Sequence, residues 1–475
     1  MRIFDTYVQQ LKYRVLKEVA KLAYENRLDE AYYKVPRIVI PEDFETTRCC
    51  IYKARAIVEE RTRLAMGGDK ENPNIIESIS IACDQCREQR FVVSQLCRGC
   101  ISHKCQEVCK VGALSFDKNH RAIIDPEKCV ECGKCKQACP YGAIVEHICP
   151  CMASCKVNAI SINENKKAVI DYDKCVMCGA CVYNCPFGAM SDKSFILDVI
   201  KLLKNADENH KVYAVIAPAI VSQFKYAKIG QIVTGIKRIG FHEVVEAAFG
   251  ADVVLYKEAM ELKEKGKLTT SCCPAFVMQI EKHFPKVKEY VSHNVSPMIE
   301  TARFIKSQDP NASVVFIGPC IAKKQEIRRE EFKGIVDAVI TFEELQSLLD
   351  SRDVNVEDLP ESVLNNASYY GRIFAKSSGI TQGAKDLLAK EAPDFEVKPL
   401  VMNGLEECKI GLLKFGKNLL DANFLEGMAC VGGCINGSGC LHHGDKNAID
   451  VDKYGMEAYE KDVMSSYEIY QLNKK

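Results

Sequence analysis

Two copies of one cysteine pattern constrain this chain more than any other feature of its sequence. The first copy begins at Cys105 and reads CQEVCKVGALSFDKNHRAIIDPEKCVECGKCKQACPYGAI. The second begins at Cys151 and reads CMASCKVNAISINENKKAVIDYDKCVMCGACVYNCPFGAM. Six cysteines match between the copies at a constant offset of 46 residues. The segment is therefore an internal repeat, and both copies are predicted to form the same small unit.

Each copy contains the spacing CxxCxxCxxxCP, which is typical of bacterial ferredoxin segments that bind 4Fe-4S clusters. Three closely spaced cysteines bind one cluster, and the fourth reaches a neighbouring cluster. The first predicted ligand set is Cys109, Cys129, Cys132 and Cys135. Its neighbour has the predicted ligands Cys97, Cys100, Cys105 and Cys139. In the second copy the same rule gives Cys155, Cys175, Cys178 and Cys181.

The second copy leaves Cys151 and Cys185 two ligands short, because the repeat offset leads to no further cysteine. The upstream segment ACDQC has the missing CxxC spacing. Our hypothesis is a fourth cluster with the ligands Cys83, Cys86, Cys151 and Cys185. Two alternatives stay open: Cys149 or His147 is a ligand, or the fourth cluster is absent. A disulfide scaffold, the other common use of many cysteines, belongs to small secreted chains.

Charge and hydropathy exclude several classes of protein. Lys plus Arg balance Asp plus Glu at 64 each, so no strong field favours nucleic acid or an anionic membrane. The N-terminus reads as a charged amphipathic helix without the features of a secretory signal, and the apolar runs are too short to cross a bilayer. We expect a cytoplasmic protein with no nucleic-acid or membrane partner. No GxGxxG fingerprint occurs, which argues against direct use of NAD.

Beyond Cys185, strand-like apolar runs such as VYAVIAPAI alternate with charged helical segments such as TFEELQSLLD, which predicts an α/β domain. We divide the chain into an N-terminal helical segment (1–78), the duplicated ferredoxin-like region (79–195) and the α/β domain (196–475). The α/β domain carries cysteines in three stretches, TSCCPAF, IGPCIAKKQE and MACVGGCINGSGC. Four thiolates from these stretches would suffice for a cubane. A zinc site is the alternative, but zinc does not explain an adjacent chain of redox clusters.

TSCCP, PCxAKKxE and MACxGGCxNGxG, in this order and downstream of ferredoxin motifs, resemble the three signatures of iron-only hydrogenases. The resemblance extends over residues 80 to 445, and its details are most similar to the branch often called group B. It implies an H-cluster, in which a 4Fe-4S cubane shares one thiolate with a diiron centre that carries CO, cyanide and an azadithiolate bridge. The cubane ligands implied by motif position are Cys273, Cys320, Cys430 and Cys434, the last being the shared thiolate.

The resemblance also implies catalytic roles. Lys323 would hydrogen-bond a cyanide ligand, and Cys272 would pass protons to and from the azadithiolate amine. The onward proton path would use Glu261, Ser292 and Glu258. Without the resemblance, the lysine would be read as solvated, Cys272 as a small buried hydrophobe and the other three as surface residues.

Around the diiron centre the resemblance implies contacts from Ala217, Pro218, Pro297, Met298, Gly318 and Met428. The sequence departs from the better-known pattern at three positions. Ala219 stands where a serine is common, Met298 where a glutamine is common, and Gly318 where a methionine is common. These changes put catalytic bias, inhibitor sensitivity and operating potential in doubt.

The function implied is reversible interconversion of dihydrogen with protons and electrons. Three to four accessory 4Fe-4S clusters would relay the electrons to or from a soluble ferredoxin, and dedicated maturation proteins would build the diiron centre. The alternatives are a dihydrogen sensor, a non-catalytic relative that lacks the diiron centre, and a polyferredoxin that only carries electrons. Four further cysteines have no assigned role and are expected to be buried structural thiols: Cys49, Cys50, Cys408 and Cys440.

Overall fold

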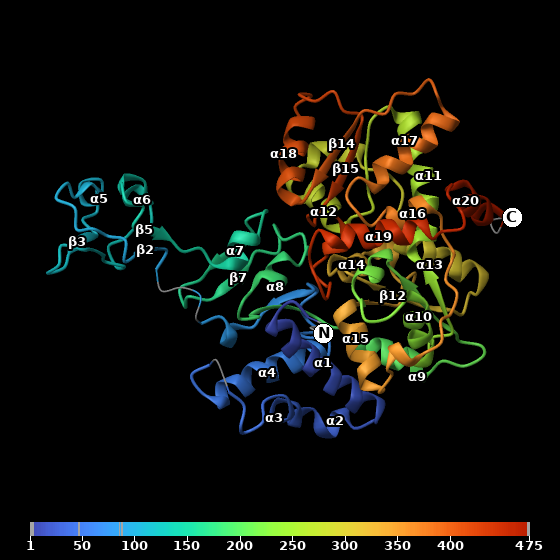
Figure 1. Ribbon diagram of the computed structural model, residues 1–475, viewed down its shortest axis with the longest axis horizontal. Coiled ribbons are helices and arrows are strands. Elements are labelled where there is room, and N and C mark those ends of the chain that lie inside the picture. The colour runs from blue at the N-terminus through green and yellow to red at the C-terminus, as the bar shows by residue number, and fades with distance from the viewer. Residues whose placement is uncertain (1–3, 46–47, 85, 87–88, 473–475) are drawn as a thin grey trace.

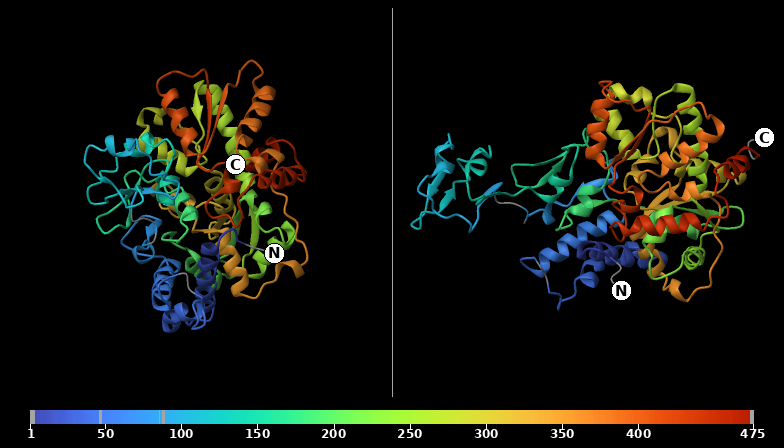
Figure 2. Two further views of the ribbon diagram at one scale, coloured as in Figure 1. Left: turned by 60° about the vertical axis from the view of Figure 1, so that its left-hand side comes forward. Right: turned by 45° about the horizontal axis from the view of Figure 1, so that its top comes forward.

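The computed structural model describes residues 4–45, 48–84, 86 and 89–472. Figure 1 shows an elongated molecule, with a large α/β body at one end and a small cysteine-rich unit projecting at the other. Figure 2 shows the same projection from a second direction. The order of the parts agrees with the predicted fold class, since the duplicated cysteine-rich region precedes the large α/β domain.

The N-terminal helices pack against the α/β body. They are α1 (Tyr7–Tyr24), α2 (Leu28–Ala31), α3 (Val35–Val39) and α4 (Ile51–Ala65). Thr6 begins α1 with a capping box, in which its hydroxyl accepts a hydrogen bond from the Gln9 backbone N–H at 3.2 Å. The buried face of α1 lies on α15 (Phe342–Ser351).

The cysteine-rich region consists of two nested modules of the same local fold. In the module that is inserted in the other, β2 (Phe91–Val93) pairs antiparallel with β5 (Ile144–Glu146). In the module that surrounds this insertion in the sequence, β1 (Ile76–Ser78) pairs antiparallel with β8 (Met190–Asp192). We call residues 91–146 the first module; residues 76–83, Cys86 and residues 149–192 form the second module. The first module is thus an insertion within the second.

Inside each module the repeat produces matching elements. The first module contains α5 (Lys104–Glu107), β3 (Leu114–Phe116), β4 (Ala122–Ile124) and α6 (Lys134–Ala138). The second contains α7 (Pro150–Ser154), β6 (Ile160–Ile162), β7 (Ala168–Ile170) and α8 (Ala180–Asn184). The hairpins and the second helices keep the 46-residue offset. The predicted boundary at residue 78 falls inside the second module, because β1 begins at Ile76.

The α/β body contains two parallel sheets. One has the order β10 (Glu243–Glu246), β9 (Val212–Ile216), β12 (Ser313–Gly318), β13 (Ala338–Thr341). The other has the order β11 (Leu268–Thr269), β15 (Phe424–Met428), β14 (Pro399–Asn403). Runs such as SVVFIG are almost continuously apolar because parallel strands are covered by helices on both faces.

Helices surround these sheets (Figure 1). In chain order they are α9 (Ile196–Lys204), α10 (Ile229–Arg238), α11 (Ala247–Lys265), α12 (Pro274–His283), α13 (Pro297–Gln308), α14 (Ala322–Glu326), α15, α16 (Tyr369–Ile373), α17 (Gly379–Glu391), α18 (Leu405–Phe415), α19 (Lys446–Met456) and α20 (Met464–Leu472). Helix α11 crosses the body and packs closely on α13. A Cβ at Gly250 would lie 2.3 Å from the Pro297 carbonyl oxygen, so this glycine allows the close approach.

A buried ionic cluster joins the three parts of the molecule. Lys324 is fully buried and pairs with Asp192 of the second module at 2.8 Å and with Glu344 of α15 at 2.9 Å. Lys12 of α1 pairs with the same aspartate at 2.5 Å. Removing one partner would leave an uncompensated buried charge, which typically costs about 3–5 kcal/mol. The cluster therefore fixes the second module against the α/β body.

Among the residues described, we find no helix whose length and apolar character would let it cross a membrane.

Candidate functional site

The three cysteine stretches of the α/β body meet at the carboxyl ends of its parallel strands. Cys273 follows β11 and caps α12, Cys320 follows β12, and Cys430 and Cys434 follow β15. The ends of parallel strands are a common location for ligand sites in α/β sheets. Burial raises the pKa of the Cys434 thiol to about 12, and the neighbouring thiols of Cys320 and Cys273 contribute to the rise. Burial and the same three thiols also raise the pKa of Cys430. The four predicted cubane cysteines therefore lie in one cluster.

This donor set fits a 4Fe-4S cubane, which takes one thiolate at each of four iron corners. The neighbouring thiols disfavour one another's ionised forms, and a bound metal would reverse that preference because its ligands are thiolates. Within the described part of the chain, no three His, Cys, Asp or Glu side chains converge closely enough to hold a single metal ion.

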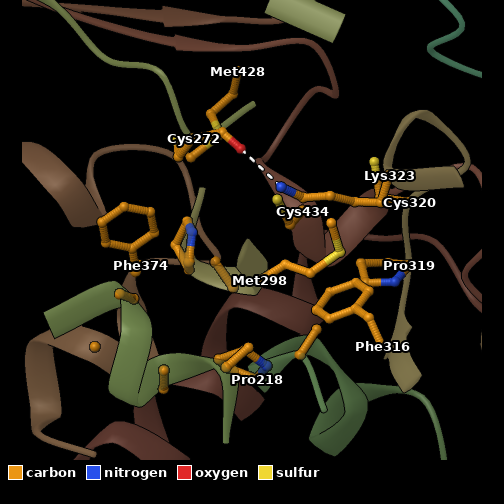
Figure 3. A pocket seen from close by; sticks show the side chains of 17 residues that line it. Pro218, Cys272, Met298, Phe316, Pro319, Cys320, Lys323, Phe374, Met428 and Cys434 are labelled. Carbon is orange, nitrogen blue, oxygen red and sulfur yellow. Dashed lines mark hydrogen bonds between the residues drawn. The ribbon is translucent and has the colours of Figure 1, made fainter. Parts of the chain in front are cut away.

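Beside these cysteines lies a cavity of about 70 Å³ (Figure 3). Three thiols line this cavity, from Cys272, Cys320 and Cys434, together with one ammonium, from Lys323. The remaining labelled side chains are apolar: Pro218, Met298, Phe316, Pro319, Phe374 and Met428. A small, apolar cavity with thiols on one side fits a group that needs a sulfur ligand and exclusion from water.

Lys323 is held inside this cavity and is not a solvated lysine, since its exposed fraction is 8%. Its ammonium donates to the Cys272 carbonyl oxygen at 3.2 Å, as drawn in Figure 3, and pairs with Glu326 at 2.7 Å. Burial lowers the pKa of this lysine, but Glu326 and the thiols of Cys320 and Cys272 outweigh burial and raise it overall. Lys323 therefore stays charged in an apolar site.

The Cys272 thiol is buried at the cavity. Burial raises the pKa of this thiol most, and the negative charge of Glu258 raises it further. Glu258 lies on α11 and is fully buried. Its Oε1 accepts hydrogen bonds from the Ser271 N–H and hydroxyl, both at 3.0 Å, whereas its Oε2 has no donor in the described residues. Burial raises the pKa of Glu258 to about 7, although the Ser271 bonds oppose the rise. This carboxyl can gain and lose a proton near neutral pH.

From Glu258, polar groups continue to the surface. The Ser292 hydroxyl interacts with Glu258 and donates to Glu261 Oε2 at 2.7 Å. Glu261 pairs with Lys265 at 2.6 Å and lies 3.5 Å from the ring of His293, whose side chain is 80% exposed. Burial opposes ionisation of Glu261, but hydrogen bonds from Lys265 and Ser292 lower its pKa overall. Polar groups thus extend from Glu258, near the Cys272 thiol, to the surface.

The structure brings together most of the predicted site residues. The cavity wall includes Ala217, Pro218, Pro297, Met298 and Met428, whereas Cys273 and Cys430 lie outside it within the cysteine cluster. Gly318 does not line the cavity either. A Cβ there would lie 2.5 Å from the Phe316 ring, so Gly318 allows that ring its position.

Four contributors were not anticipated from the sequence. Ser271 and Glu326 sit inside the quoted motifs, so their positions relative to Cys272 and Lys323 were available as signals. Phe316 and Phe374 line the cavity, but an apolar residue in or after a buried segment cannot be told from an ordinary core residue by its sequence.

The cysteines of the first module form two groups. Cys139 and Cys100 are the thiol neighbours of Cys105, and Cys129 and Cys109 are those of Cys135. In the second module, Cys181 neighbours Cys178, Cys175 and Cys155. Each of these groups contains members of only one of the three ligand sets given by the repeat.

Backbone N–H groups donate to several of these sulfurs at matching positions of the repeat. In the first module, Ala122 donates to Cys97 at 3.5 Å and Ala143 donates to Cys139 at 3.4 Å. In the second, Ala168 donates to Cys83 at 3.3 Å and Ala189 donates to Cys185 at 3.2 Å. Ala122 and Ala168 are 46 residues apart, so Cys83 occupies in the second module the position that Cys97 occupies in the first.

The second module adjoins the cysteine cluster of the α/β body. Cys273 is a neighbour of the Cys178 thiol, and Cys178 is a neighbour of Cys430. Cys178 and Cys430 also line one open cleft of about 650 Å³. Clusters bound at these two groups would therefore be adjacent.

The expectation of burial is confirmed for Cys408 and Cys440 and wrong for Cys49 and Cys50. Cys408 lies against backbone carbonyls of Met402 and Met428, so it packs as a structural thiol. Cys49 and Cys50 are exposed beside the start of α4, with their sulfurs 3.8 Å apart. All 26 cysteines lie in the described part of the chain, and none forms a disulfide there.

Comparison with known families assigns most of the chain. Residues 210–438 match the family described as iron only hydrogenase large subunit, C-terminal domain. Residues 96–143 match a 4Fe-4S dicluster domain, and residues 168–191 match a 4Fe-4S binding domain.

Similar proteins include both a hydrogenase and an assembly factor. Iron hydrogenase 1 of Clostridium pasteurianum is 30% identical over 319 residues, which cover 55% of this chain and 55% of that protein. The cytosolic Fe-S cluster assembly factor NAR1 of Eremothecium gossypii is 24% identical over 285 residues, which cover 46% of this chain and 63% of that protein. The matched region thus spans less than two thirds of each relative.

Among solved structures, the apo FeFe-hydrogenase HydA1 from Chlamydomonas reinhardtii has a TM-score of 0.50 and 19% sequence identity. The alignment covers 59% of this chain and 94% of that chain. A likeness at this identity shows a shared fold of the α/β body.

Proposed function

We propose that this chain, whose residues 210–438 match the iron-only hydrogenase family, catalyses the reversible interconversion of dihydrogen with protons and electrons at an H-cluster. The observation that carries this proposal is the convergence of Cys272 and Lys323 on one buried cavity beside the four cubane cysteines. A protein that only held a cubane would need neither group.

The residues that would hold the cubane are Cys273, Cys320, Cys430 and Cys434, the last also binding the diiron centre. When bound, the H-cluster would supply the splitting of dihydrogen into two protons and two electrons. Lys323 would orient a cyanide ligand, because Glu326 keeps its ammonium charged and fixed. Phe316, Phe374 and the two methionines of the cavity exclude water.

The proton route would use the polar path to the surface. The Cys272 thiol exchanges a proton with Glu258, the carboxyl whose charge raises the pKa of this thiol. Ser292 connects Glu258 to Glu261, and the carboxylate of Glu261 delivers the proton to the exposed end of the path. A series of polar groups from the cavity side to the surface favours turnover over a purely structural role.

The electron route would run through the two modules. Cys178 belongs to the group next to the cubane cysteines, so its cluster would be the inner relay. The fourth set of thiols, with Cys83 in the position equivalent to Cys97, supports four accessory clusters. The first module projects from the body and would be the outer contact.

The electron partner would be a soluble ferredoxin. The first module, residues 91–146, contains eight Lys and Arg against six Asp and Glu, which suits an acidic protein surface. Maturation proteins would supply the diiron centre, because nothing in the chain provides its CO and cyanide ligands.

The similarity to an assembly factor makes an experiment on turnover essential. The anaerobically matured full-length protein should give infrared bands of metal-bound CO and cyanide that shift under dihydrogen, together with dihydrogen uptake. Absence of these bands after competent maturation would refute the proposal. Shifting bands with negligible turnover would identify a dihydrogen sensor instead.

A matched pair of variants localises the activity. Cys272→Ala should keep the infrared bands and lose most turnover, because the thiol that faces the cavity is gone. Cys408→Ala removes another buried thiol that lies outside the cavity wall and should retain turnover. Equal activity of the two variants would contradict the relay role of Cys272.

A further inference from the structure

Five thiols, one more than a cubane can use, gather in the second module. Cys86 has Cys149 as a hydrogen-bond partner and Cys151 and Cys185 as close neighbours. Cys151 in turn has Cys185, Cys149 and Cys83 as neighbours. A 4Fe-4S cluster binds four cysteines, so one thiol at this site has no iron corner of its own.

The repeat identifies which ligands are fixed. Cys83 and Cys185 accept backbone N–H bonds from Ala168 and Ala189, as their counterparts do in the first module. Cys151 is the counterpart of Cys105. The surplus therefore arises between Cys86, the counterpart of Cys100, and Cys149, which the repeat does not provide.

Pro150 explains why the side chain of Cys149 lies at this site. Its counterpart is His103, which has the left-handed φ of 40° and stacks its ring on Phe116 at 3.8 Å. Cys149 precedes Pro150, and a residue before proline is restricted to extended conformations. It accordingly has φ −56° and ψ 131°, and its side chain is buried beside Cys86. Proline thus converts a turn position into one that contributes a thiol.

The two thiols differ in their exposure to solvent. Cys149 is 1% exposed, whereas Cys86 is partly exposed, in a loop near the surface. Asp84, between Cys83 and Cys86, pairs with Arg48 at 3.1 Å and also with Lys53, so residues at the start of α4 hold this loop. The more exposed ligand, Cys86, therefore has a fully buried thiol beside it.

We propose that the fourth cluster has two alternative fourth ligands, Cys86 and Cys149, and that Cys149 retains the cluster when Cys86 is released. The inference rests on the fourth cluster proposed above. In the exchange, the iron–sulfur bond to Cys86 breaks and one to Cys149 forms. The proton that leaves the Cys149 thiol passes to the Cys86 thiolate, so no electrons or other reactants are required.

The test compares equivalent ligands of the two modules in the full-length, anaerobically purified protein. Cys100→Ala has no substitute thiol and should lose about four irons with the EPR signal of its cluster. Cys86→Ala should keep its iron and show a cluster signal with altered g values, because a different cysteine completes the ligand set. The double variant Cys86→Ala/Cys149→Ala should lose about four irons.

Two results would overturn the inference: iron loss in Cys86→Ala equal to that in Cys100→Ala, or retention of iron in the double variant. Misfolding is detected independently, because the first-module clusters and the circular dichroism of the body must stay unchanged. Cys83→Ala separates the two proposals. If this variant and the wild type both hold about twelve accessory irons, the fourth cluster itself is absent. If Cys83→Ala loses about four irons, only the role of Cys149 is in question.

Discussion

The two ferredoxin-like modules have the same local fold and opposite surroundings. Val130 of the first module is 64% exposed, whereas its counterpart Val176, 46 residues later, is 1% exposed. The first module has its own small core around Phe91, Leu114 and Ile144, while the second shares the main core of the molecule. The cysteine spacing therefore determines the fold of a module, and the α/β body determines whether that module faces solvent or an internal partner.

This comparison predicts its largest effect at equivalent cluster ligands. Cys178→Ala should reduce dihydrogen-dependent dye reduction to background, because Cys178 belongs to the group adjacent to the cubane cysteines. Cys132→Ala should lose as much iron, about four atoms, but keep activity with small dyes that can react at inner clusters. Iron content and dye-reduction rates of both variants provide the check. Equal loss of activity would mean that electrons must pass through the first module.

The proton path should respond separately from both modules. Glu258→Gln should lower turnover about 10²–10⁴-fold with unchanged iron content, because the amide cannot exchange a proton with Cys272. Burial raises the pKa of Glu258 to about 7, so the carboxyl is ionised mainly above that pH. Dihydrogen oxidation needs the ionised carboxylate as a proton acceptor, so its rate should rise as the pH increases through about 7. The rate of dihydrogen evolution should fall over the same range.

The pH profiles of uptake and evolution in the wild type and the glutamine variant measure this effect. The variant should lose the inflection near pH 7 in both directions. An inflection that persists in the variant would assign the titration to another group.

Burial predicts a smaller contrast in stability. Val176→Ala should destabilise the second module by about 2 kcal/mol, because it removes two methyl groups from a packed core. Val130→Ala should change stability by less than about 0.5 kcal/mol, since its side chain is mostly in water. The temperature at which the cluster absorbance is lost, at a fixed heating rate, compares the two. Similar shifts would show that the modules depend equally on their surroundings.

The smallest predicted effect concerns partner docking. Lys128 and Lys174 are counterparts, and each pairs with an aspartate three residues earlier, at 3.4 Å and 2.6 Å respectively. Lys128→Glu on the projecting module should raise the KM for an acidic ferredoxin about twofold to tenfold and weaken its salt dependence. Lys174→Glu should leave the KM unchanged. The opposite ranking would move the docking surface to the second module.

Local features of this protein were predictable from its sequence, whereas features that depend on distant contacts were not. The cysteine groups follow from spacing within the chain, and the cubane cysteines follow from motif order. The fourth ligand set already joins Cys83 and Cys86 to the second copy, but the pairing of β1 with β8 was missed. These strands have three residues each and lie more than 100 residues apart. Pairings of such short strands leave almost no signal in the sequence.

Exposure was equally hard to predict. The adjacent cysteines Cys49 and Cys50 looked like buried thiols by residue type, but their position before α4 leaves them in solvent. Ser271 was missed because its contact with Glu258 forms only when α11 brings that carboxylate to it, and neighbouring residues in the sequence do not reveal such a contact. The assignments to the group B branch and to the cytoplasm stay predictions.

The insertion of one module within the other has a consequence for synthesis of the chain. Cys83 and Cys86 leave the ribosome first, then the entire first module, and only afterwards Cys151 and Cys185. The first module can complete both of its ligand sets while the second still lacks half of one. Because elements that close over long separations form late, the fourth ligand set should be the last of the accessory sets to assemble. A nascent chain stalled before Cys151 would therefore contain a complete first module without any connection to the α/β body.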